Sequence, residues 1–164
     1  MTPQVAGAIA AGAVVAGGTG IGAYMLTNNS SYPITLEVFL QGKEISDDNK
    51  TNYTGEGKLG SEVQNRKLLV AGVEENKDWW NKRYEKSKEK SGAKLDGAKS
   101  AAFKTVTSGY GTDEHTSLNK VCNSHYKKSK EDFKGDEANA TLKADLKLDV
   151  EKFCTLNGNG SLIV

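Results

Sequence analysis

The amino-acid sequence predicts a mainly α-helical protein, in which an N-terminal transmembrane helix precedes a small bundle of three to four helices. Two observations support this fold class. Residues 3–26 form a run of 24 residues without a charged side chain, and beyond residue 61 the apolar residues recur at steps of three or four. Because an α-helix has about 3.6 residues per turn, that spacing gathers the apolar side chains on one face of each helix.

The uncharged run is long enough to cross a bilayer. A helix rises about 1.5 Å per residue and the hydrocarbon core is about 30 Å thick, so roughly 20 residues are needed. The run holds seven Val, Ile, Met or Leu residues, seven alanines and six glycines, which makes its hydrophobicity marginal. We expect residues 1–27 to be a transmembrane anchor or an uncleaved signal. A cleaved signal peptide is the nearest alternative, although no Lys or Arg precedes the run.

Two further expectations concern the behaviour of this run in the lipid bilayer. The spacing Gly18-x-x-x-Gly22 matches the small-residue motif through which transmembrane helices pack closely, and it predicts a homodimer. A run this rich in Ala and Gly also produces that spacing by chance. The first basic residue after the run is Lys43, and cytoplasmic flanks usually carry an excess of Lys and Arg. We therefore expect a single-pass protein of the cell membrane whose C-terminal part is extracytoplasmic.

The loop from Gly18 to Ala23 also fits the pattern G-x-G-x-x-A of dinucleotide-binding proteins. That fingerprint needs a strand before it and a full helix after it. Here only the residues IGAYML follow before the turn-forming sequence TNNSSYP, which is too short for such a helix. We expect a protein that is not an enzyme, with no catalytic residues and no cofactor. A nucleotide-binding enzyme that uses this loop is the alternative.

Residues 28–60 read as a linker that contains one short strand. The segment YPITLEVFL, residues 32–40, is rich in β-branched and aromatic residues and predicts this strand, with an extended membrane-proximal segment as an equal alternative. Residues 41–60 are rich in Gly, Asn, Asp, Lys and Thr and show no apolar periodicity, which is typical of a solvated linker.

Residues 61–164 are predicted to form the helical domain. Its first helix places Trp80 and Tyr84 on one face, and a short helix is expected around Phe103. The remaining two helices have the longest runs of apolar residues at helical spacing. Their one-faced residues are Leu118, Val121, Cys122, His125, Tyr126 and Phe133 in one, and Leu142, Leu146, Val150, Phe153 and Cys154 in the other. After the last helix, Gly158 and Gly160 suit a left-handed turn.

Two residue pairs are candidates for a special role. Cys122 and Cys154 lie on consecutive helices, and antiparallel packing would bring them together. In an exported domain we expect them to form a disulfide, whereas in a cytosolic protein they are small core residues. Trp79 and Trp80 are either core aromatics or a partner-binding pair, and Trp79 lies four residues before Arg83, at a spacing that suits a cation–π contact.

Metal and nucleic-acid binding are not expected. The pattern Cys122-x-x-His125, with His115 nearby, lacks the second close pair of a zinc site. The net charge is +1, and basic and acidic residues are interspersed, so the excess positive charge that phosphate backbones require is missing. The lipid bilayer and a host or protein partner remain the expected partners.

Three segments together resemble the paralogous uncharacterised proteins of haemotropic mycoplasmas. They are the uncharged start AGAIAAGAVVAGGTGIGAYML, the helical stretch KDWWNKRYEK and the late ending EKFCTLNG. The chain departs from that pattern at Phe153, where a tryptophan is expected beside the cysteine. The resemblance implies a membrane-anchored or exported helical protein with a role in host interaction or antigenic display, and no catalytic residues. A secreted structural antigen is a further alternative.

Overall fold

The structure, a computed structural model, describes residues 32–42, 45–135 and 139–164. The anchor predicted over residues 1–27, the dimer motif of Gly18 and Gly22, and the loop from Gly18 to Ala23 all lie outside the described residues. Within the three ranges, no helix combines the length and the apolar character that crossing a membrane requires.

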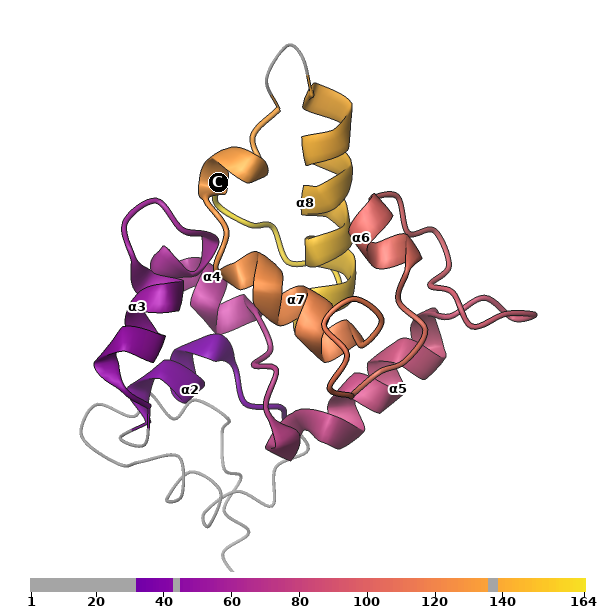
Figure 1. Ribbon diagram of the computed structural model, residues 1–164, viewed down its shortest axis with the longest axis horizontal. Helices are drawn as coiled ribbons and strands as arrows, with labels where there is room; N and C mark the ends of the chain where they lie inside the picture. The colour runs from indigo at the N-terminus through magenta and orange to yellow at the C-terminus, as the bar shows by residue number, and fades with distance from the viewer. Residues whose placement is uncertain (1–31, 43–44, 136–138) are drawn as a thin grey trace, which may run out of the picture.

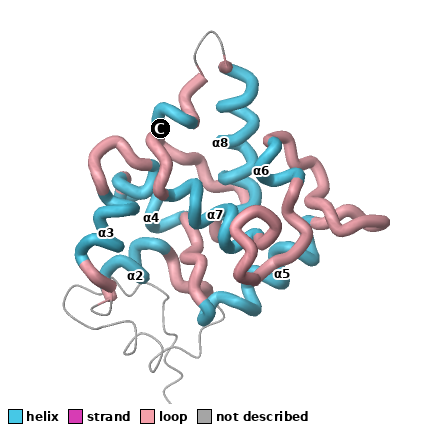
Figure 2. Tube along the Cα trace, in the orientation of Figure 1, coloured by secondary structure: helices cyan, strands magenta, loops and turns pink. Residues whose placement is uncertain are grey.

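Helices dominate the described part of the chain, where pairing of the β type is limited to isolated bridges (Figures 1 and 2). The α-helices are α2 (Leu36–Gln41), α3 (Asp47–Thr54), α4 (Val63–Leu68), α5 (Lys77–Ser87), α6 (Ala101–Lys104), α7 (Leu118–Tyr126) and α8 (Ala140–Cys154). Short 3₁₀ turns are η1 (Leu59–Ser61), η2 (Glu74–Asn76) and η3 (Lys130–Asp132). The mainly α-helical class is confirmed, although the helices are shorter and more numerous than the three or four predicted.

The strand predicted over residues 32–40 is wrong, because most of that segment forms helix α2. The hydroxyl of Thr35 accepts a hydrogen bond from the backbone N–H of Val38 and caps the helix. Leu36 and Leu40, one helical turn apart, are both buried. Only Thr35 pairs in a β manner, through an isolated bridge to Val70. Burial of this leucine pair outweighs the strand preference of the neighbouring β-branched residues.

The interpretation of residues 41–60 as a solvated linker is also wrong. Helix α3 begins after Ser46, whose hydroxyl accepts from the N–H of Asn49. Tyr53 is buried and donates its hydroxyl proton to the Asn123 side chain of α7, at 2.7 Å. Leu59 is completely buried. Two apolar side chains are thus enough to join a polar segment to the core, and the folded body includes the buried residues Ile34 and Leu36 ahead of it.

The hydrophobic core is centred on α7, which contacts α5, α6, α8 and η1 (Figure 1). The rings of Phe103 in α6 and Phe153 in α8 stack with their centroids 5.5 Å apart. Trp80 and Tyr126 are also completely buried in this core. Because helices close in sequence, from α5 to α8, supply these rings, the second half of the chain builds most of the core.

Residues 69–73 are not helical, although the apolar spacing beyond residue 61 predicted helices in this part of the chain. They are extended, and α5 begins only at Lys77. The reason lies in Asn76, whose buried side chain donates to the carbonyls of Ile34 and Ala71 and accepts from the N–H of Ile34. Val70 N–H donates to the carbonyl of Cys154. These bonds satisfy the extended backbone, which would otherwise be buried without partners.

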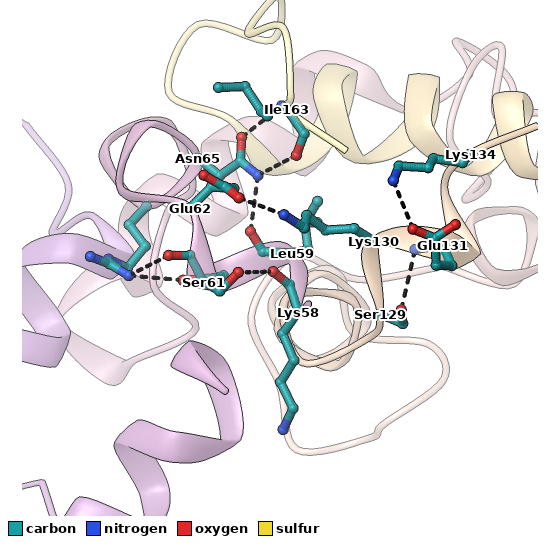
Figure 3. Close-up of polar contacts among 12 residues, drawn as sticks. Lys58, Leu59, Ser61, Glu62, Asn65, Ser129, Lys130, Glu131, Lys134 and Ile163 are labelled. Carbon is teal, nitrogen blue, oxygen red and sulfur yellow. Dashed lines mark hydrogen bonds and ion pairs between the residues drawn. The ribbon is translucent and has the colours of Figure 1, made fainter. Parts of the chain in front are cut away.

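A second buried asparagine holds the C-terminal segment against α4 through hydrogen bonds to the backbone (Figure 3). The buried side chain of Asn65 donates to the carbonyls of Leu59 and Ile163 and accepts from the N–H of Ile163. The ammonium of Lys130 pairs with the carboxylate of Glu62 beside it. Leu162 is buried, so the last residues belong to the folded body.

The two long patterns near the C-terminus correspond to helices, with different boundaries. Helix α7 ends at Tyr126, and Phe133, which the pattern placed on the same helix, is buried from the turn that follows η3. In α8 the residues Val150, Phe153 and Cys154 are buried, whereas Leu142 is exposed. Gly158 has the left-handed backbone conformation, φ +72°, in the turn that follows α8, whereas Gly160 does not.

Candidate functional site

The structure brings Cys122 and Cys154 together in a disulfide with a Cα–Cα distance of 5.6 Å. Cys122 lies in the middle of α7 and Cys154 is the last residue of α8, and both are completely buried. Tyr126, one turn after Cys122, donates its hydroxyl proton to the carbonyl of Val70 at 2.9 Å and lies 3.3 Å from that of Cys154. The disulfide therefore sits where α7, α8 and the extended segment meet.

The tryptophan pair of α5 is divided between the core and its edge. Trp80 is completely buried, and its indole N–H donates to the carbonyl of Ala71 at 3.0 Å. Trp79 is half-buried and meets Trp80 edge to face, with ring centroids 4.8 Å apart. The guanidinium of Arg83 lies 4.7 Å from the centre of the Trp79 ring and donates to the carbonyl of Thr155. Trp79 thus packs at the junction of α5 with the segment after α8, while partner binding by the pair stays a prediction.

The histidines and cysteines of the predicted helices do not gather into one cluster. Cys122 Sγ is bonded to Cys154, and His125 is enclosed between the rings of Phe103 and Phe133. His115 and His125 both line a cavity of about 250 Å³. In residues 32–42, 45–135 and 139–164, no three His, Cys, Asp or Glu side chains converge on a point that could hold a metal ion.

His125 is the most perturbed histidine of the site. Its side chain is 4% exposed, its Nε2 has no hydrogen-bond partner among the described residues, and its Nδ1 lies 3.1 Å from the Ser124 hydroxyl. Burial, with a smaller contribution from the positive charge of Lys128, lowers the pKa of His125 from 6.5 to about 4. The folded protein therefore holds this imidazole neutral at pH 7.

We expect acid to destabilise the fold through His125. In the unfolded chain its pKa is about 6.5, so between pH 6.5 and pH 4 the unfolded state binds more protons than the folded state. Stability contributed by the neutral imidazole is complete above pH 6.5 and falls by about 3 kcal/mol as the pH drops to 4. Urea denaturation of the wild type and of His125→Gln at several pH values measures how steeply the free energy of unfolding depends on pH in each protein. His115→Gln, at an exposed histidine, should keep the wild-type slope, and equal slopes in all three proteins would contradict the assignment.

A cavity lies at the C-terminal end of α8. It has a volume of about 470 Å³, and the segment around Gly97, the end of α8 and the turn after it form its walls. The lining residues are Gly97, Lys99, Leu148, Asp149, Glu151, Lys152, Gly158, Asn159, Gly160 and Ser161. Pockets for small ligands usually measure about 300–1,000 Å³. The size of the cavity makes it the candidate binding site of this domain.

Asp149 organises the wall of this cavity. Its carboxylate is 1% exposed and accepts hydrogen bonds from the backbone N–H groups of Lys99 and Ser100 and from the Ser100 hydroxyl. A carboxylate of α8 thereby fixes the residues that precede α6. Neither Asp149 nor Lys99 belongs to a motif that predicts a site from the sequence. The available signal was an acidic residue on the apolar face of α8, one position before Val150.

No family model, curated protein or solved structure matches this chain.

Proposed function

We propose that this protein is a membrane-anchored, extracytoplasmic helical domain that is displayed for binding to a partner and carries out no catalysis. The observation that supports an extracytoplasmic location best is the Cys122–Cys154 disulfide, since disulfides form and persist mainly in oxidising compartments. The uncharged run of residues 3–26 supports the anchor. Host interaction or antigenic display is the role that the resemblance to haemotropic mycoplasma proteins implies.

The location is tested by protease treatment of intact cells, followed by carbonate extraction of their membranes. We expect added protease to digest the domain in intact cells, and the undigested protein to stay in the carbonate-resistant membrane pellet. A thiol reagent should label the denatured protein at Cys122 and Cys154 only after reduction. Full protection from protease, together with two thiols that react without reduction, would overturn the extracytoplasmic location.

The anchor is tested separately by a pair of matched variants. Replacing Val14 and Val15 by Asp puts two carboxylates into the uncharged run, and each opposes membrane insertion by about 2.5–3.5 kcal/mol. We expect this variant to leave the membrane pellet and the control with Leu at both positions to remain there. If the wild type is instead found in the culture medium, the protein is a secreted antigen and the anchor is wrong.

A further inference from the structure

The cavity at the end of α8 offers hydrogen-bond donors that the folded chain does not use. Among the described residues, the ammonium of Lys99, the side chain of Asn159 and the hydroxyl of Ser161 have no hydrogen-bond or ion-pair partner. All three residues line the cavity, and Lys99 and Asn159 are exposed. Lone donors at the wall of a cavity favour a ligand rich in oxygen acceptors.

A second positive charge at the cavity also lacks a carboxylate partner. The ammonium of Lys152 donates to the backbone carbonyl of Asp96 at 2.8 Å and lies 4.9 Å from the centre of the Phe153 ring. Neither contact neutralises its charge. Lys152 lines the same cavity as Lys99, so a ligand inside it faces two ammonium groups.

The two acidic residues of the lining are already engaged by the protein. Asp149 accepts from the two N–H groups and the hydroxyl described above. Glu151 accepts from the N–H of Leu162 at 2.8 Å, and its carboxylate lies 3.4 Å from the ammonium of Lys147. Glu151 is therefore paired with a cation of the protein and Asp149 is held by three neutral donors, whereas Lys99 and Lys152 have no carboxylate partner among the described residues.

Two glycines bring the backbone close to cationic groups at this site. Gly97 has φ +67°, and a Cβ atom there would lie 3.0 Å from the ammonium of Lys152. Gly158 has φ +72°, and a Cβ atom there would lie only 2.7 Å from a guanidinium nitrogen of Arg83. Arg83 thus adds positive charge behind the turn. Both positions need the left-handed conformation that glycine adopts without strain.

We propose that this cavity binds the phosphate group of a small phosphate ester, with Lys99 and Lys152 balancing its charge. Asn159 and Ser161 donate hydrogen bonds to the phosphate or to the hydroxyl groups of the ester. Charge-assisted hydrogen bonds to phosphate are about twice as strong as neutral ones, which favours a phosphate over an uncharged ligand here. A free phosphate ester and the headgroup of a phospholipid share this chemistry. The inference is independent of the location proposed above.

The experiment uses the full chain, purified in a non-ionic detergent and labelled with ¹⁵N. Its amide resonances are followed while glycerol 3-phosphate or, as the uncharged match, glycerol is added. We expect glycerol 3-phosphate to shift the amides of Gly97, Gly158 and Gly160 in a saturable way, and glycerol to leave them in place. Shifts that do not saturate, or that spread over lysines outside the cavity, would mean non-specific ion binding and would overturn the proposal.

Variants that remove one positive charge test the role of Lys99 in binding. Lys99→Gln removes an exposed side chain without a described partner, so the fold should be retained, and one charge-assisted contact corresponds to about a tenfold weaker affinity. Lys67→Gln, on the exposed face of α4, is the matched control and should bind like the wild type. Equal affinities of all three proteins would refute the site.

Binding to lipid vesicles shows whether the phosphate belongs to a lipid headgroup or to a free ester. Binding to vesicles of phosphatidylglycerol, absent with phosphatidylcholine and weakened by Lys99→Gln, assigns a lipid headgroup. Saturable binding of glycerol 3-phosphate without vesicle binding assigns a free ester. Either pattern supports the phosphate site, while an absence of binding to every probe contradicts it. None of these readouts depends on where the protein resides in the cell.

Discussion

Replacing both Cys122 and Cys154 by Ala is expected to lower the free energy of unfolding by about 4 kcal/mol. The cysteines are 32 residues apart, and closing a loop of this length restricts the unfolded chain by roughly that amount in the chain-entropy model. Both side chains are completely buried, so their truncation also removes packing. Urea denaturation followed by far-ultraviolet circular dichroism measures the change.

Reduction of the wild type provides the matched control for the cysteine variant. Wild-type protein in dithiothreitol should lose a similar free energy, and the double variant should not respond to dithiothreitol at all. A loss below about 1 kcal/mol in both experiments would show that the cross-link contributes little to stability. A variant that responds to the reductant would point to some other effect of the reagent.

Replacing Trp80 by Ala is expected to cost about 4 kcal/mol, within the range of about 3–5 kcal/mol for large aromatic residues in a core. The indole is completely buried, and its N–H bond to Ala71 helps to hold the extended segment. Truncation leaves a cavity, and the carbonyl of Ala71 keeps only its hydrogen bond from the Asn76 side chain. The midpoint of urea denaturation measures the loss, provided that the slope of the transition is unchanged.

Trp79→Ala, at the adjacent tryptophan, is the matched comparison for Trp80→Ala. Trp79 is half-buried and packs against Trp80 and Arg83 without a buried hydrogen bond of its own, so we expect a loss of about 1–2 kcal/mol. Equal losses for the two variants would contradict the division of the pair between core and edge. A Trp79 variant that keeps its fold is also the right reagent with which to test partner binding.

Regular periodicity is what allowed helices to be predicted in the second half of the chain. The spacing of Val150, Phe153 and Cys154 predicted the buried face of α8, and Trp80 and Tyr84 predicted that of α5. Helix α2 was not predicted, because its buried face consists of only Leu36 and Leu40. A six-residue helix contains too few turns for a period to be seen. Local sequence there favoured a strand, and tertiary packing overrode it.

The candidate site was harder to predict than the helices, for a different reason. Its cavity joins Lys99 to residues of α8 and of the turn after it, and the anchoring bond from Lys99 N–H reaches Asp149, 50 positions away. A single sequence carries no signal for such a pairing unless both partners belong to a known motif. The pairing of Cys122 with Cys154 was easier to foresee, because the chain contains only two cysteines.

Asn65 and Asn76 take the place of neighbouring strands in joining distant backbone segments. Each side-chain amide pairs with the backbone of a distant segment, as a neighbouring strand would, and uses both its donor and its acceptor. Extended segments are thereby joined without building a sheet. Open sheet edges are templates on which further chains can add and aggregate. In residues 32–42, 45–135 and 139–164, pairing of the β type is limited to isolated bridges, so these residues form no strand that offers such an edge.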